Sequence, residues 1–585
     1  MKRQISLLVL LIITTSILMA QPVDTARFRV DFIPQIQNFQ KINPSAVIND
    51  TIKEKVKFDY YITPKKLDIS FIPSKVKSVK LPPDVMKRLY RNFLKLGIGY
   101  PVTPLAQLCI HNFDNSKFSY GMNVNHFSSW ANPIGREFKK YAYAPVSDTR
   151  TYLFFKSFFK NVTLYSSIGY NHEVAHLYGF SKDLGYNEYY YEKNYRDTLK
   201  NNFHHLFAEV GIRTNHVLED KKLKYDIRFN YDFLATYKKE NENRFGLHTY
   251  FAYDERFLKL SGSQNYRMDV NFDFYNNKWA YEMPNFPYTK NGYKLEFKPT
   301  MNFTIKEYHI LLGLGVPVVN TTLYEKAKCP LYPVGELQLG LVPGILSIYG
   351  GIDGNTELYT LQKLLYENPY TKPNLDSLKF TRTQISVYGG IKGNLIKKLN
   401  YHISARYSYT ADMPFFFLDT NTVLKNQFEI IYSNANILNV CANLNWQVID
   451  KLYLNLDANF WNYFKLSKID YAWYKPQFEI AFGGKYYLKS QFIFDLNFML
   501  VFGRKGIEPL LNNQYKEITM KPVLNFDLGF EYLISKQFSA FARINNIGAQ
   551  YFSKYYDFKN LGINALIGIT YSFGDESLIQ QKRRR

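Results

Sequence analysis

The chain has 585 residues with a formal net charge of +23, and 46% of them are hydrophobic. No run of 18 or more apolar residues follows the N-terminal segment, which excludes helical membrane spans. The 50 Tyr and 47 Phe are spread along the whole length, a distribution that argues against a string of soluble domains with short cores.

The first twenty residues have the order of a secretory signal peptide. Lys2 and Arg3 precede an apolar stretch from Ile5 to Met19, and the small residue Ala20 stands before Gln21. We therefore predict a signal peptide over residues 1–20 that is cleaved after Ala20. In an exported chain the basic excess is expected to face anionic lipid headgroups and lipopolysaccharide, not nucleic acid.

Residues 21–90 show little sustained alternation of apolar and polar positions. They carry prolines among charges, at Pro22, Pro34, Pro44, Pro64, Pro73, Pro82 and Pro83. Such stretches adopt extended conformations. We predict a periplasmic N-terminal extension that is able to thread into a lumen.

Residues 91–573 fall into segments with period-2 alternation, separated by clusters of Asn, Asp, Gly, Lys and Pro. Between Leu223 and Phe233, apolar residues at odd positions alternate with polar residues from Lys224 to Asp232. Similar segments run from Tyr266 to Phe274, from Leu452 to Asp457 and from Leu524 to Tyr532. This pattern, with aromatic residues for two interfacial girdles, is typical of strands with one lipid face and one wet face.

These segments predict an all-β fold, a large antiparallel transmembrane β-barrel of about 16–22 strands. An even number is expected, because closure satisfies every backbone group in lipid. Soluble all-β repeats are the competing interpretation of the same alternation. Tyr359 to Ser377, with its Asn368-Pro369 and Lys372-Pro373 pairs, reads as a loop with a short helical turn.

The C-terminal stretch from Leu533 to Phe573 carries a family resemblance. It reads LISKQFSAFARINNIGAQYFSKYYDFKNLGINALIGITYSF and ends on an aromatic residue, with Phe541, Arg543, Asn545, Gly568 and Phe573 in ordered spacing. In these features it resembles the last three strands of TonB-dependent receptor barrels. The segments that start at Lys95 (KLGIGYPVTPLAQL) and Val387 (VYGGIKGNLIKKLNYHISARYSY) look like plugless relatives of those barrels.

Two features depart from the receptor pattern. Receptors of this kind carry a plug of well over a hundred residues and a TonB-contacting segment, and residues 21–90 show neither. Residues 574–585 add a basic tail after the terminal aromatic residue, which we interpret as a solvated segment or a contact for a periplasmic partner. The resemblance therefore implies the barrel but not energy-coupled uptake.

His172-Glu173-Val174-Ala175-His176 matches the H-E-x-x-H zinc motif, which requires a helix. The neighbouring residues, from Val162 to Phe180, favour a strand, which would separate the two His side chains by about 13 Å. Cys109, Cys329 and Cys441 have no paired-ligand spacing, and no nucleotide-binding motif occurs. We therefore expect no catalytic residues, metal or cofactor.

The lumen candidates are charged residues on the wet faces of two predicted strands. They are Asp226, Arg228, Asp232, Arg267, Asp269 and Asp273. Salt bridges between neighbouring strands are their simplest role, and solute contact is the functional alternative.

We predict a multi-pass outer-membrane β-barrel of a Gram-negative cell that mediates passage or binding of a solute or macromolecule. The chief alternative is a non-transporting accessory or scaffold barrel of a secretion or assembly complex. An enzyme of the outer leaflet is third. The expected partners are outer-membrane lipids and lipopolysaccharide, the barrel-assembly machinery during biogenesis, and an outer-membrane or periplasmic protein.

Overall fold

The computed structural model describes most of the chain from Tyr90 to Gly574. The described residues are 90–112, 117–130, 144–179, 199–215, 222–237, 240–259, 262–278, 289–372, 378–396, 398–422, 424–489, 491–560 and 562–574. The predicted signal peptide, residues 21–89 of the Pro-rich extension and the tail from residue 575 lie outside them. No helix in the described residues is long and apolar enough to cross a membrane.

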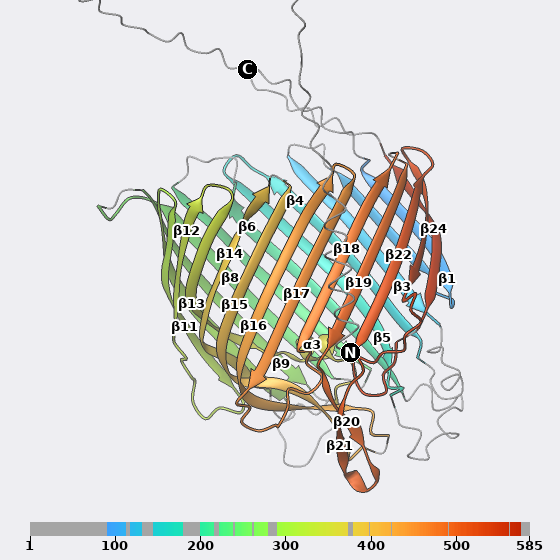
Figure 1. The fold of residues 1–585 in the computed structure, drawn as a ribbon. Coiled ribbons are helices and arrows are strands. Elements are labelled where there is room, and N and C mark those ends of the chain that lie inside the picture. The colour runs from blue at the N-terminus through green and yellow to red at the C-terminus, as the bar shows by residue number, and fades with distance from the viewer. Residues whose placement is uncertain are drawn as a thin grey trace, which may run out of the picture. The chain divides into compact units, whose positions relative to one another are not determined.

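Within the described residues, 22 strands form one closed antiparallel barrel (Figure 1). They are β1 (Asn92–Tyr100), β2 (Leu105–Asn112), β3 (Phe118–Ser129), β4 (Val146–Phe158), β5 (Val162–His176), β6 (Lys200–Thr214), β7 (Leu223–Thr236), β8 (Asn241–Asp254), β9 (Ser263–Lys278), β10 (Thr289–Ile305), β11 (Tyr308–Thr321), β12 (Tyr332–Val342), β13 (Leu346–Leu358), β14 (Phe380–Ile396), β15 (Leu399–Leu418), β16 (Phe428–Ile449), β17 (Leu452–Phe464), β18 (Phe478–Leu488), β19 (Phe492–Phe502), β22 (Val523–Leu533), β23 (Phe538–Asn545) and β24 (Asn564–Phe573). The predicted fold class is confirmed, at the upper end of the predicted strand range.

The barrel closes at a seam between its first and last strands. β1 pairs with β24, so that Asn92 lies opposite Phe573 and Tyr100 lies opposite Ala565. The two backbones approach closely at Gly568, where an added Cβ would lie 2.1 Å from the carbonyl oxygen of Leu96. Closure at this seam leaves no open sheet edge in the barrel.

The alternation in the sequence becomes an apolar outer face and a polar inner face. On β7, Phe229 is 48% exposed, and its register partner Val210 on β6 is 52% exposed. Their neighbours along the strands, such as Arg228 and Glu209, point to the other face. Exposed apolar side chains of this kind are suited to contact lipid acyl chains.

The two ends of the barrel are connected differently. At the end that we call the turn end, β10–β11, β14–β15 and β16–β17 are joined by two-residue connections. The opposite end, the loop end, carries the longer connections, among them those that hold the hairpin β20 (Lys505–Pro509)–β21 (Tyr515–Thr519), the short 3-10 helix η3 (Leu511–Asn513) and helix α3 (Leu361–Glu367). Figure 1 shows the hairpin and α3 at the lower end of the barrel.

Helix α3 begins where the sequence predicted a loop with a short helical turn, which is confirmed. Its N-cap is Thr360, whose hydroxyl accepts a hydrogen bond from the backbone N–H of Lys363. Leu361, Leu364 and Leu365 are buried on one side of the helix. A seven-residue helix is too short to be stable alone, so this packing holds it.

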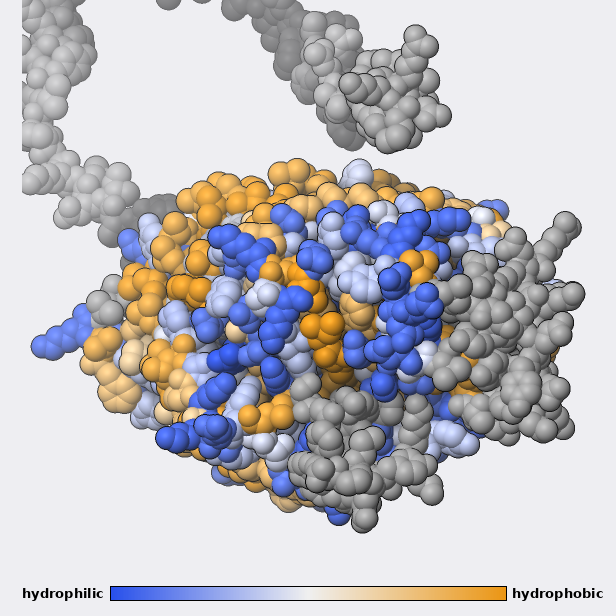
Figure 2. Space-filling model, turned by 90° about the horizontal axis from the view of Figure 1, so that it is seen from below, coloured by the Kyte–Doolittle hydropathy of each residue, from blue (hydrophilic) through white to orange (hydrophobic). Residues whose placement is uncertain are grey.

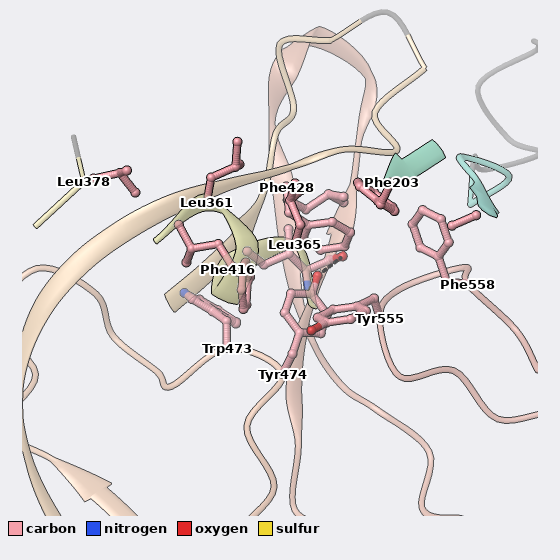
Figure 3. Packing of buried hydrophobic residues seen from close by; sticks show 14 of the residues in the cluster. Phe203, Leu361, Leu365, Leu378, Phe416, Phe428, Trp473, Tyr474, Tyr555 and Phe558 are labelled. Carbon is pink, nitrogen blue, oxygen red and sulfur yellow. Dashed lines mark hydrogen bonds between the residues drawn. The ribbon is translucent and has the colours of Figure 1, made fainter. Parts of the chain in front are cut away.

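The three leucines belong to an apolar core at the loop end, which we call the mouth cluster (Figure 3). Its buried members come from the loop-side ends of β5–β7, β9, β15 and β16, from α3, and from the connections after β13, β17, β19 and β23. They are Ala175, Phe203, Leu234, Tyr275, Leu361, Leu364, Leu365, Leu378, Phe416, Leu418, Phe428, Trp473, Tyr474, Ile507, Met520, Tyr555 and Phe558. The cluster therefore joins opposite arcs of the barrel across its mouth. From outside, the loop end mixes polar surface with apolar patches (Figure 2).

Candidate functional site

A cavity of about 610 Å³ lies against the polar wall formed by β6–β10, β12 and β13. Polar and charged side chains dominate its lining, which comprises Arg213, Thr214, Lys224, Tyr225, Asp226, Arg228, His248, Thr249, Tyr250, Arg267, Asp269, Asn271, Glu296, Lys298, Tyr332, Gly354 and Asn355. A space of this size is within the range of small-molecule sites. Its polar lining suits a hydrated, hydrogen-bonding solute better than an apolar one.

Four of the six predicted lumen candidates line this cavity: Asp226 and Arg228 on β7, and Arg267 and Asp269 on β9. Asp232 lines a neighbouring cavity of about 440 Å³, to which Arg228 also contributes. Oδ1 of Asp273 lies 3.4 Å from Nε2 of His248, and His248 lines both cavities. The structure thus gathers all six on one stretch of wall, and solute contact by them stays a prediction.

Ion pairs and hydrogen bonds occupy the carboxylates among these candidates. Arg244 donates to Asp232 across β8 and β7 at 2.7 Å, which is the cross-strand pairing expected from the sequence. The Arg267 guanidinium lies 2.9 Å from Asp269 on the same strand. Asp226 accepts a hydrogen bond from the Tyr165 hydroxyl at 2.5 Å. These contacts fix the wall's charges in place.

The sequence interpretation missed several residues of the cavity. Arg213 comes from β6, Glu296 and Lys298 from β10, and Tyr332 from the first position of β12. The Tyr332 hydroxyl donates to Glu296 at 2.6 Å, and Lys294 lies 3.2 Å from the same carboxylate. The alternation in β6 and β10 carried the signal, since these residues occupy the polar register of each strand.

The H-E-x-x-H motif lies in strand β5, not in a helix. The His172 ring stacks on His204 of β6, with 4.6 Å between ring centroids, whereas Nδ1 of His176 lies 2.8 Å from the carbonyl oxygen of Pro145. The two histidines therefore have separate surroundings. In the part of the chain that the structure describes, no group of three or more His, Cys, Asp or Glu side chains is placed to hold a metal ion.

The segment from Tyr359 to Lys372, which we call the mouth segment, is bonded to the barrel wall on one side. Glu242 of β8 is 2% exposed, and its carboxylate accepts the backbone N–H groups of Leu361 at 2.7 Å and Gln362 at 3.2 Å. Asn201 of β6 donates to the carbonyl oxygen of Pro369 at 3.0 Å. A carboxylate at the first turn of a helix also interacts favourably with the helix dipole.

Loops bind the other side of the mouth segment. Lys475 forms an ion pair with Glu367, whose carbonyl oxygen accepts hydrogen bonds from Lys554 at 2.9 Å and from the Tyr555 hydroxyl at 3.0 Å. Tyr370 stacks on Phe558 with 3.6 Å between ring centroids. The mouth segment therefore bridges β6 and β8 on one arc to the loops after β17 and β23.

Comparison with solved structures identifies the architecture. The pyoverdine outer membrane receptor FpvA from Pseudomonas aeruginosa PAO1 matches 83% of this chain and 79% of its own, with a TM-score of 0.63 and 10% identity. The chain has the fold of a TonB-dependent receptor barrel. Two further solved structures share this receptor-type barrel. The siderophore receptor PirA from Acinetobacter baumannii has a TM-score of 0.62 and 11% identity, and the match covers 82% of this chain and 80% of PirA. The ferric-catecholate import receptor Fiu from K12 E. coli has a TM-score of 0.60 and 8% identity, and the match covers 83% of this chain and 82% of Fiu.

No protein-family model matches the sequence, and no curated protein matches it. The identities of 8–11% to these receptors show the shared fold and carry no ligand across. The resemblance seen in the C-terminal strands is thus confirmed at the level of the receptor-type barrel.

Proposed function

We propose that the chain is an exported outer-membrane barrel that mediates passage or binding of a solute or macromolecule. The observation that carries this proposal is the closed 22-strand barrel with a charged inner wall and a cavity of about 610 Å³. An inner wall with that many charged groups is suited to contact a polar solute, as in other selective pores. Its structural neighbours are receptors, and the proposal includes no catalytic step.

The mouth cluster and the mouth segment act as a gate in this proposal. The mouth segment is part of the chain's own loops and lies across the mouth, where its leucines are buried. Passage then requires that this segment leave the cluster, whereas the barrel wall stays paired. The N-terminal extension, residues 21–90, which the sequence indicates is able to thread into the lumen, is a second candidate obstruction.

Single-channel conductance in planar bilayers tests the proposal with three proteins: the full chain, a variant lacking residues 21–89, and Glu242→Ala. The Glu242→Ala variant removes the acceptor of the first two N–H groups of α3 and is expected to raise open probability. Glu336→Ala is the matched control, because Glu336 accepts the Tyr388 hydroxyl on the wall at 2.7 Å. Silence of all the proteins would contradict a passage role.

A non-transporting accessory barrel of a secretion or assembly complex is the second candidate. The packed mouth favours it, because a buried apolar core across the opening opposes free diffusion. The β20–β21 hairpin projects at the loop end and exposes Leu510 and Tyr515, by 39% and 47%, to a protein partner. Co-purification of a stoichiometric membrane or periplasmic protein, together with silence in bilayers, would favour this function.

Outer-membrane lipids and lipopolysaccharide are the surroundings that the proposal assigns to the outer face. The exposed apolar residues of β4 to β7, such as Leu153, Ile168, Val210 and Phe229, support this assignment. Insertion through the barrel-assembly machinery belongs to the same proposal, with Phe573 at the end of β24 as the terminal aromatic residue.

A further inference from the structure

Two cations in the wall cavity have no carboxylate partner. Among the described residues, no carboxylate oxygen lies within 4.0 Å of the guanidinium of Arg213 or the ammonium of Lys298. The Arg213 guanidinium makes a cation–π contact, 5.5 Å from the centre of the Tyr165 ring. Arg228 is also weakly paired, because its nearest carboxylate oxygen, on Glu209, lies 3.9 Å away.

The carboxylates of the same cavity are already engaged. Asp226 accepts the Tyr165 hydroxyl, although its register partner on β6 is Arg213. Asp269 is paired with Arg267, and Glu296 binds both Lys294 and Tyr332. The lining holds five cations, Arg213, Lys224, Arg228, Arg267 and Lys298, and three carboxylates, Asp226, Asp269 and Glu296. Lys224 is paired at 2.8 Å with Asp254, outside the lining, and Arg267 is paired with Asp269. The positive charges that lack a close carboxylate are therefore those of Arg213, Arg228 and Lys298.

The strand registers place Arg213 on β6 and Lys298 on β10 in the same row of the wall, four strand spacings of about 4.8 Å apart. We propose that this cavity binds an anionic solute that carries at least two phosphate or carboxylate groups, one held by Arg213 and another by Lys298. Arg228 adds a third cation at the cavity, and Asn271 and Asn355 in the lining supply amide groups for hydroxyl or carbonyl oxygens. A guanidinium offers a planar fork of donors and an ammonium a compact charge, and both recognise phosphate and carboxylate oxygens. The proposal rests on the proposed function and names the class of solute.

Isothermal titration calorimetry on the full chain in detergent at low ionic strength tests the proposal. The probes are tripolyphosphate and citrate, which separate phosphate from carboxylate recognition. Arg213→Gln and Lys298→Gln are each expected to weaken binding of the preferred probe about tenfold, since a charge-assisted hydrogen bond is lost. The double variant is expected to show no measurable binding of either probe. The Lys298→Arg variant is expected to retain binding of the preferred probe.

Arg543→Gln is the matched control. Arg543 lies on β23, outside the cavity, and pairs with Asp495 at 3.0 Å, so its loss changes the net charge equally without touching the cavity. Heat-modified mobility on gels confirms that each variant remains a folded barrel.

The outcomes separate this inference from the proposed function, because binding is measured without passage. Saturable binding that the double variant loses and Arg543→Gln keeps supports the inference, even for a barrel that never conducts. Equal binding in all the variants, or none in the unaltered chain, overturns it, even for a barrel that conducts.

Discussion

The turn end and the loop end of the barrel are stabilised in different ways. At the turn end, two-residue connections leave exposed ion pairs such as Lys398–Asp450, whose side chains are 43% and 85% exposed. At the loop end, Leu364 and Phe428 are 0% exposed in the mouth cluster. The sheet's hydrogen bonds fix the wall at both ends, but within the described ranges only the loop end adds a core like that of a soluble domain. The loop end can therefore rearrange without unfolding of the barrel.

Truncation of a buried side chain in the mouth cluster should have the largest effect on the difference in stability between the two ends. Phe428→Ala removes a fully buried ring that contacts Tyr474, Tyr555 and Phe558, and we expect it to destabilise the mouth cluster by about 3–5 kcal/mol. Hydrogen exchange should increase in residues 361–367 and stay low in the strands. Leu524→Ala, at a 47% exposed position on the outer face, is the control. Uniformly faster exchange in both regions would show that the two ends are one cooperative unit.

Alkaline pH should have the next largest effect on stability, and this effect should again be confined to the loop end. Burial raises the pKa of Tyr370 to about 12, and burial holds the pKa of Tyr178 and Tyr555 well above the usual value. Their stabilising contribution is fully present below about pH 10 and is lost as pH rises through the folded pKa values, by about 3 kcal/mol for Tyr370.

Tyrosinate absorbance at 295 nm and near-ultraviolet circular dichroism, followed from pH 9 to 12.5, measure this effect. Tyr370→Phe should shift the loss of the loop-end dichroic signal to higher pH, because one group that must ionise is gone. Formation of all the tyrosinates near pH 10 with no change in dichroism would contradict the assigned burial.

The smallest effect on stability is expected from a substitution at the turn end. Lys398→Ala removes the ion pair with Asp450. Because both charges are exposed and screened by salt, the midpoint temperature of thermal unfolding should stay the same. Differential scanning calorimetry at low and high salt measures it. A clear drop in midpoint would show that the turn end also contributes to stability.

The fold could be predicted because a lipid-facing strand must alternate. β7 repeats this alternation from Leu223 to Phe233, and the structure gives the strand as Leu223–Thr236. The strand number could be predicted only as a range, for a physical reason. β1 and β2 have only nine and eight residues, and β1 places Gly97 and Gly99 beside a single charge, Lys95, in its wet register, which weakens the alternation.

The candidate site could be predicted only in part. Asp226 and Arg228 stood out because they share one strongly alternating strand, whereas their relation to Lys298 and Tyr332 depends on the registers from β7 to β12. The mouth cluster was beyond the sequence pattern. Its residues, such as Leu364 of α3 and Tyr555 of the loop after β23, come from strand ends, a short helix and loops that are far apart in the chain, so no single period along the sequence marks them.

The seam where β1 meets β24 has a consequence for the surrounding bilayer. The four strands at the seam, β23, β24, β1 and β2, have only 8–10 residues, whereas β15 and β16 have 20 and 22. Nine residues at ~3.4 Å each and a tilt of ~45° cover about 22 Å along the membrane normal, less than the ~25 Å apolar band of such barrels. Hydrophobic mismatch then acts on one side of the barrel, and the lipids beside the seam are expected to thin or the barrel to lean.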